Sequence, residues 1–152
     1  ENTIASNVIT QIKVVTHFKQ GNLELAKKEL TNLTDESIYV RDTSLKIIDD
    51  YGLSQKKNPT KALILSLVPG GGYIYAGHKQ TGITSLLINS MLAYATINSF
   101  QKENYGLGIL TGVFNLSFYV GNMQGAKKSA DRYNENIKYN SVSKLESITN
   151  LN

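Results

Sequence analysis

The sequence predicts an all-α protein in which a small N-terminal helical bundle is followed by a transmembrane helical hairpin. Three observations lead to this prediction. In the first third of the chain, apolar residues recur every three or four positions, as on one face of a helix. Residues 80–101 and 104–126 then form two windows, of 22 and 23 residues, without a charged side chain. A helix needs about 20 largely apolar residues to cross a hydrocarbon core, and Gln101–Tyr105 supplies the turn.

Residues 1–55 have the pattern of three short amphipathic helices. Their apolar faces are, in order, Ile4, Val8, Ile12, Val15 and Phe18; Leu23, Ala26, Leu30 and Leu33; and Ile38, Leu45, Ile48 and Tyr51. Gly21 suits the end of the first helix and Asn22 the start of the second. We expect Thr34 or Asp35 to cap the third helix and Gly52 to end it.

Part of this region resembles a known repeat. Residues 18–30 (FKQGNLELAKKEL) resemble the helix–turn–helix core of a tetratricopeptide repeat. One such unit does not form a stable array, because several stacked repeats are needed to bury a continuous core. A small antiparallel helical bundle is an equally good interpretation of the same residues.

A glycine-rich segment lies between the linker, residues 56–61, and the hairpin. Pro59 suits the first turn of a helix. The apolar run that follows reaches about 16 residues when it is extended to Gly77, which favours a re-entrant or interfacial segment over a full crossing. Its turn residues are Pro69, Gly70, Gly71, Gly72, Tyr73, Tyr75 and Gly77. The segment lacks the Gly-Lys-Ser/Thr ending of a phosphate-binding loop.

Residues 66–83 (SLVPGGGYIYAGHKQTGI) are similar to the signature of small bacterial membrane proteins with a Pro-Gly-x-Gly-x-x-Tyr-x-Gly motif. The strings at 118–126 and 132–134 also resemble the second span and exit of that family. The resemblance covers about residues 60–135 and implies two closely spaced transmembrane helices in a bacterial membrane, the inner one by expectation. It implies no catalytic residue. The expected membrane domain is 62–126, with spans at about 81–100 and 105–126.

Polar and small residues in the two windows predict how the helices pack. Asn89 lies 14 residues before Glu103 and Asn115 lies 12 after it, so an antiparallel hairpin places both amides at a similar depth. We expect them to clamp the hairpin by bonding each other. Small residues that allow close helix packing are Gly108, Gly112, Gly121 and Gly125. They serve packing within the hairpin, docking onto another membrane subunit, or both.

Charge and composition limit the possible functions. Basic residues flank the apolar region, which favours a cytoplasmic location for both ends of the hairpin. Lys127, Lys128 and Arg132 are expected to contact lipid headgroups, in a basic helix that ends in a flexible tail from about residue 140 to 152. With no Cys and only two His, His17 and His78, we expect no metal site and no cofactor. The modest charge does not favour nucleic-acid binding.

These features predict a multi-pass membrane protein that is not an enzyme. The main hypothesis is an accessory or scaffold subunit of a bacterial envelope complex, which anchors a small helical interaction domain. Its partners are then membrane lipids and other membrane subunits. Two alternatives stay open: a component of a transporter or channel that works as a homo-oligomer, and a soluble helical adaptor in which the apolar hairpin is a buried core.

Overall fold

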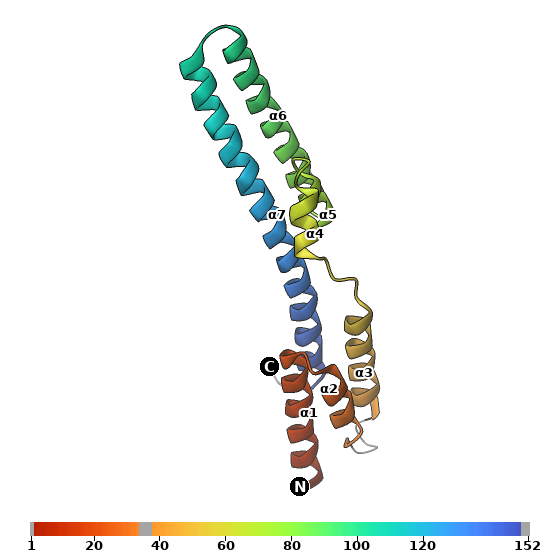
Figure 1. The fold of residues 1–152 in the computed structure, drawn as a ribbon. Coiled ribbons are helices and arrows are strands. Elements are labelled where there is room, and N and C mark those ends of the chain that lie inside the picture. Colours follow the sequence, from red (N-terminus) through yellow and green to blue (C-terminus); the bar gives the residue numbers. More distant parts are fainter. Residues whose placement is uncertain (1, 34–37, 150–152) are drawn as a thin grey trace. The chain divides into compact units, whose positions relative to one another are not determined.

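The computed structural model describes residues 2–33 and 38–149, and its regular structure is entirely helical (Figure 1). The seven helices of this part of the chain are α1 (Asn2–Gln20), α2 (Leu23–Leu30), α3 (Ile38–Leu53), α4 (Pro59–Leu65), α5 (Gly71–Tyr75), α6 (Lys79–Gln101) and α7 (Tyr105–Ile148). The all-α prediction is confirmed. The helices divide between two compact units, an end unit (residues 1–55 and 135–152) and a hairpin unit (residues 56–134).

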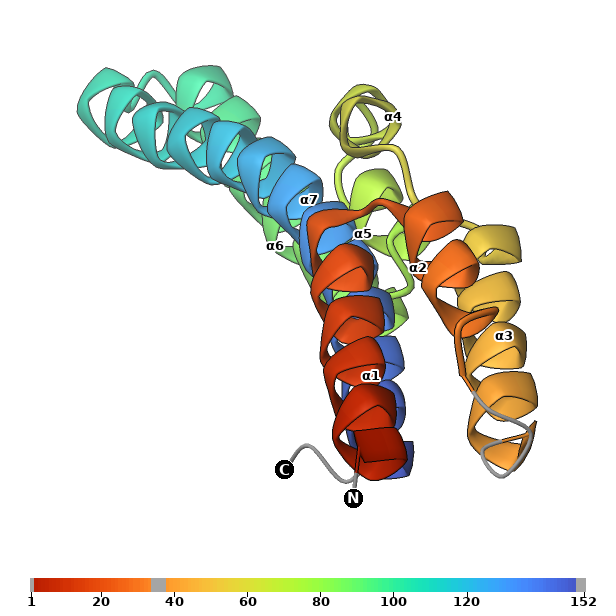
Figure 2. The ribbon, with the colours of Figure 1, turned by 90° about the horizontal axis from the view of Figure 1, so that it is seen from below.

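In the end unit, α1 and α2 form the helix–turn–helix that the sequence predicts. Gly21 adopts a left-handed backbone with φ of 85°, and its N–H donates to the carbonyl of Phe18 at 2.9 Å. Asn22 precedes α2 as expected, but its side chain caps no N–H. The C-terminal part of α7 lies beside α1 in Figures 1 and 2, and Lys19 Nζ donates to Glu146 Oε1 at 2.6 Å. The expected caps Thr34 and Asp35 lie outside the described residues.

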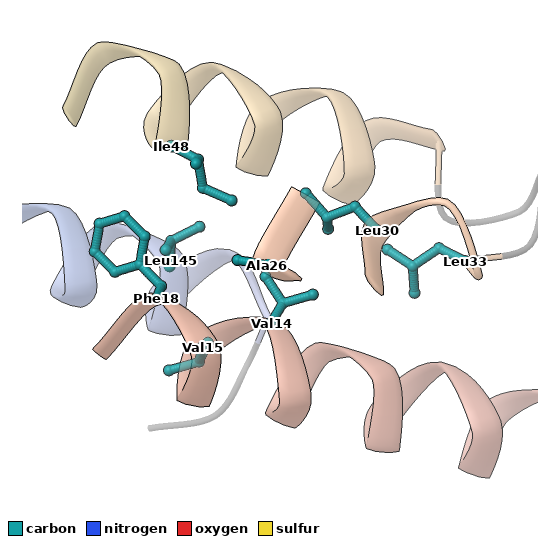
Figure 3. Close-up of a cluster of buried hydrophobic side chains, with 8 residues drawn as sticks. All are labelled: Val14, Val15, Phe18, Ala26, Leu30, Leu33, Ile48 and Leu145. Carbon is teal, nitrogen blue, oxygen red and sulfur yellow. The ribbon is translucent and has the colours of Figure 1, made fainter. Parts of the chain in front are cut away.

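Large apolar side chains fill the core of the end unit (Figure 3). The fully or almost fully buried members are Val14, Val15, Phe18, Ala26, Leu30, Leu33, Ile48 and Leu145. The Phe18 ring also meets the Tyr51 ring edge-on, with centroids 4.9 Å apart. The predicted apolar face of α1 is buried only in the C-terminal half of the helix. In the N-terminal half, the side chains of Ile4, Val8 and Ile12 are 70%, 41% and 47% exposed.

The C-terminal segment differs from its prediction. The sequence predicts a flexible tail from about residue 140, but α7 continues to Ile148. The reason is burial: Leu145 is fully buried in the end-unit core, and Val142 packs against the same core. The few apolar residues of this segment lie on one helical face, and that face packs against the end-unit core. The local sequence does not reveal this long-range contact.

The end unit also carries a surface ion pair between α2 and α3. Lys27 Nζ lies 2.7 Å from Asp49 Oδ1 and 3.9 Å from Glu24 Oε1. The hydrogen bond to Asp49 raises the pKa of Lys27 above its usual value. Because the pair is at the surface, we expect it to orient side chains more than to stabilise the fold.

The hairpin unit begins with two short helices and ends with two long ones. Asn58 caps α4, since its Oδ1 accepts from the N–H groups of Thr60 and Lys61, and Pro59 occupies the first turn as predicted. The long helices α6 and α7 run antiparallel and are joined by residues 102–104. In this turn Glu103 has a positive φ of 59°. The turn thus falls at Gln101–Tyr105, where the charge pattern places it.

We expect Phe18→Ala to destabilise the end unit by about 3–5 kcal/mol, because it removes a fully buried ring and leaves a cavity. Ile4→Ala, at an exposed site of the same helix, should change the stability by no more than about 0.5 kcal/mol. Denaturant unfolding of the full chain, followed by circular dichroism, measures both changes. Equal effects of the two substitutions would contradict the described core.

Candidate functional site

Glycines bring four backbone segments of the hairpin unit into direct contact. Gly70 has a φ of 85°, and a Cβ atom there would overlap the carbonyl oxygen of Gly82 on α6. A Cβ atom on Gly72 would overlap the Ala62 carbonyl and the Ser66 hydroxyl, and would lie 2.8 Å from the Cβ of Ala126 on α7. The glycine-rich turn is therefore not a loose loop. It lets α4 and α5 fold back sharply and pack closely on the hairpin.

Hydrogen bonds hold this turn in place. Tyr119 of α7 donates its hydroxyl to the carbonyl of Leu67, at 2.9 Å. Gly77, with φ of 93°, follows the C-cap residue of α5, and the N–H of His78 then donates to the Tyr73 carbonyl at 2.9 Å. The Tyr73 hydroxyl lies where a Cβ atom on Gly125 would be. Pro69 lines a pocket beside the turn. The residues predicted for the re-entrant turn thus lie together on one side of the hairpin.

The segment before α4 is tied to α7 by contacts that the sequence analysis missed. The N–H of Lys57 donates to Asn134 Oδ1 at 2.7 Å, and Asn134 Nδ2 donates to the Lys57 carbonyl at 2.8 Å. The Lys57 ammonium lies 5.2 Å from the centre of the Tyr75 ring and 5.5 Å from that of Tyr133, as in cation–π contacts. The Tyr75 hydroxyl accepts from the N–H of Asn58 at 3.0 Å. No sequence signal marks a pairing across 77 residues.

Burial in the hairpin unit is the reverse of burial in the end unit. Its buried positions hold no side chain larger than asparagine: Ala62, Ser66, Gly70, Gly72, Ala76, Gly82, Ser85, Asn89, Ser99, Gly108, Ala126, Ser129 and Ala130. Its large apolar side chains lie on the outside of α6 and α7. The most exposed of them include Met91 (70%), Tyr94 (71%), Leu116 (65%), Ile109 (61%) and Val113 (60%).

Polar side chains of the two long helices are mostly turned inward or bonded to their own helix. Ser99 donates to the carbonyl of Ala95 at 2.7 Å, and Ser117 donates to that of Val113 at 2.8 Å. Between the helices, the hydroxyl oxygens of Thr96 and Thr111 are 3.1 Å apart. These bonds lower the cost of removing the hydroxyl groups from water.

The expected clamp between Asn89 and Asn115 does not form. Asn89 Nδ2 donates instead to the carbonyl of Ser85 at 2.8 Å, one helical turn back, and Asn89 Oδ1 has no partner among the described residues. Both asparagines line one pocket of about 300 Å³, together with Pro69 and Tyr119. The predicted similar depth thus agrees with the structure, but the Asn89 amide is bonded to the backbone of its own helix and not to Asn115.

The four glycines expected to pack have different surroundings. A Cβ atom on Gly108 would lie 3.0 Å from the Phe100 ring, and one on Gly112 would lie 3.4 Å from Thr96 Cγ2. Gly125 faces the Tyr73 hydroxyl. Gly121 is exposed, with no atom within 4 Å of its Cβ position, and it borders a groove of about 260 Å³ with Phe114 and Phe118. Three of the glycines therefore serve contacts within the unit, whereas Gly121 leaves an open surface.

The expected headgroup residues are all exposed. These are Lys127, Lys128 and Arg132, and Arg132 Nη2 donates to the Ser129 hydroxyl at 3.2 Å. Within residues 2–33 and 38–149, no three His, Asp or Glu side chains are grouped as a metal site would need. His17 and His78 lie in different units.

We expect Gly72→Ala to destabilise the hairpin unit by at least about 1–3 kcal/mol, because backbone and side-chain atoms of two other helices occupy the space of the added methyl group. Gly121→Ala is the matched control: its site is open and helical, so it should be neutral or stabilise by up to about 1 kcal/mol. Thermal unfolding in mild detergent would measure both. A harmless Gly72→Ala would contradict the described close packing.

Two further findings bear on this surface. None of the described helices combines the length and the apolar character needed to cross a membrane. No protein-family model, curated protein or solved structure matches the chain.

Proposed function

We propose that the chain is a non-enzymatic membrane protein, in which the α6–α7 hairpin lies in lipid and anchors the end unit as an interaction domain. In this role it is an accessory or scaffold subunit of a bacterial envelope complex. One observation carries the proposal. The hairpin unit exposes its large apolar side chains and buries small ones, including serines and an asparagine.

The end unit provides an internal comparison. It buries Phe18, Leu30, Ile48 and Leu145, as proteins in water do. Contiguous apolar surface of the extent seen on α6 and α7 is rare on soluble monomers and marks contact with a membrane or another protein. Small residues at helix contacts are typical of helix packing in membranes, where lipid solvates the large side chains as well as the protein interior does.

The dimensions of the hairpin fit this location. α6 has 23 residues, which span about 34 Å at 1.5 Å per residue. A hydrocarbon core is about 30 Å thick. The Leu67 carbonyl accepts a hydrogen bond from Tyr119 of α7. Tyr119 lies eight residues before Lys127, which is about 12 Å along the axis of α7. The chain at Leu67 would then reach towards the middle of the membrane without crossing it, whereas Gly72, beside Ala126, would lie nearer the headgroups.

The modest hydropathy of the single helices has a specific source. Serine, threonine and asparagine lower the mean hydropathy of α6, but Ser85, Asn89 and Ser99 are buried in the hairpin. The backbone carbonyls of α6 accept bonds from Asn89, Thr96 and Ser99. We therefore take the folded pair as the unit that enters lipid, with several of its polar groups bonded inside it, although Ser85 Oγ and Asn89 Oδ1 have no partner among the described residues.

A partner subunit would find a docking surface on α7. The groove of about 260 Å³ at Gly121 is flanked by Phe114 and Phe118, and Ser117 lies one turn away. Small residues spaced by four positions let a second helix approach closely. This open groove supports the accessory-subunit role over that of a hairpin that is complete by itself.

Cysteine labelling would test the membrane location, because the natural chain has no cysteine. Ile4→Cys and Met91→Cys place a thiol at two sites that are both 70% exposed in the structure. In membranes opened by freeze–thawing, a membrane-impermeant maleimide should label position 91 on the order of tenfold more slowly or less, because an apolar surrounding suppresses the reactive thiolate.

Both variants should react alike after denaturation in detergent, which controls for the reagent. Equal labelling in the native membranes, or recovery of the chain in the soluble fraction, would favour the soluble adaptor and overturn the proposal.

Affinity purification of the tagged full chain in mild detergent, followed by mass spectrometry, would test the accessory role. Stoichiometric membrane partners are the expected result, and Gly121→Leu should reduce their recovery because its side chain fills the groove. Recovery of this chain alone, as one defined oligomer, would instead favour the transporter or channel component.

A further inference from the structure

We propose that the base of the hairpin binds the headgroups of anionic phospholipids. The binding surface, here called the basic end, consists of Lys61, Lys79, Lys127 and Lys128. This inference rests on the proposed membrane location and adds to it a class of lipid and a direction of insertion.

The basic residues of the chain are unevenly divided between its two units. Residues 56–134 carry eight basic and two acidic residues, whereas the rest of the chain carries eight basic and ten acidic ones. The positive net charge of the protein thus comes from the hairpin unit. Within that unit, the tip of the hairpin has only Lys102 and Glu103, whose charges cancel.

The four lysines of the basic end lie on three helices, close in sequence to residues that pack together. Ala62 of α4, Ala130 of α7 and Ala76, the residue that ends α5, form one buried cluster. Lys61 adjoins Ala62 in sequence, Lys79 follows Ala76 by three residues, and Lys127 and Lys128 precede Ala130 within one turn. All four lysines are exposed.

The four lysines of the basic end are not neutralised by neighbouring carboxylates in the described part of the chain. Among the described residues, no carboxylate lies within ion-pair distance of Lys61, Lys79, Lys127 or Lys128. The one acidic side chain on this part of α7 is Asp131. Lys57 differs, because its ammonium is held over the Tyr75 and Tyr133 rings.

An anionic lipid surface is the partner that this arrangement fits. The lysines lie at the end of an apolar surface, at the level where a membrane-embedded hairpin meets the headgroups. Tyr73, Tyr75 and Tyr133 are half-buried at the same end, and tyrosine is enriched at membrane interfaces. Lysine near an anionic leaflet gains free energy that is lost at a neutral one. The neutral tip is then the end that enters the bilayer.

The test uses the full chain reconstituted in vesicles of phosphatidylcholine and phosphatidylglycerol in equal amounts. After gentle extraction, the ratio of the two lipids that stay bound to the protein is measured. We expect enrichment of phosphatidylglycerol that weakens at high salt. In the variant with Lys127→Gln and Lys128→Gln, the relative affinity for phosphatidylglycerol should fall about fivefold per lysine, or roughly 25-fold in total.

The matched control replaces Lys13 and Lys28, two exposed lysines of the end unit, with glutamine. It removes the same charge but should keep the enrichment. Equal loss in both variants, or no enrichment by the unaltered chain, would overturn the headgroup site. If the chain still retains phospholipid, the membrane location itself survives this result. A chain that retains neither lipid would overturn the proposed function as well.

Discussion

The hairpin unit depends on one steric constraint, the close approach of backbones at Gly70, Gly72 and Gly82. At Gly70 and Gly82, two chain segments touch without any side chain between them. At Gly72, α5 meets both α4 and α7. These close contacts keep two helices as short as α4 and α5 folded against the hairpin. Tyr119 and Asn134 then bond the carbonyl groups of Leu67 and Lys57, which flank α4.

The two units of the chain differ in the size of the side chains that they bury. The end unit gathers large apolar side chains around Phe18, and its stability follows from removing them from water. The hairpin unit turns such side chains outward and packs small residues inside, so it has no core of large apolar side chains of the kind seen in the end unit. The proposed location in lipid accounts for this contrast, since dispersion contacts and internal hydrogen bonds then hold the helices.

Local patterns predicted much of this fold. The charge-free windows located α6, the first part of α7 and the turn between them, and the signals at Gly21 and Pro59 marked the helix boundaries nearby. Long-range pairings were not predictable. Leu145 orders a segment that looks like a tail, and Asn134 bonds Lys57 across 77 residues. The Asn89–Asn115 clamp failed because the nearest carbonyl, that of Ser85, competes for the amide. The membrane location stays a prediction.

The late position of α7 in the sequence has a consequence for the order of assembly during synthesis. Leu67, Gly72 and Tyr73 emerge from the ribosome long before the α7 residues that they contact, Tyr119, Ala126 and Gly125. The core around Phe18 likewise waits for Leu145. Neither unit can close until its part of α7 has been synthesised, so the nascent chain carries exposed apolar surface up to that point. Such surface is what aggregation and chaperones act on.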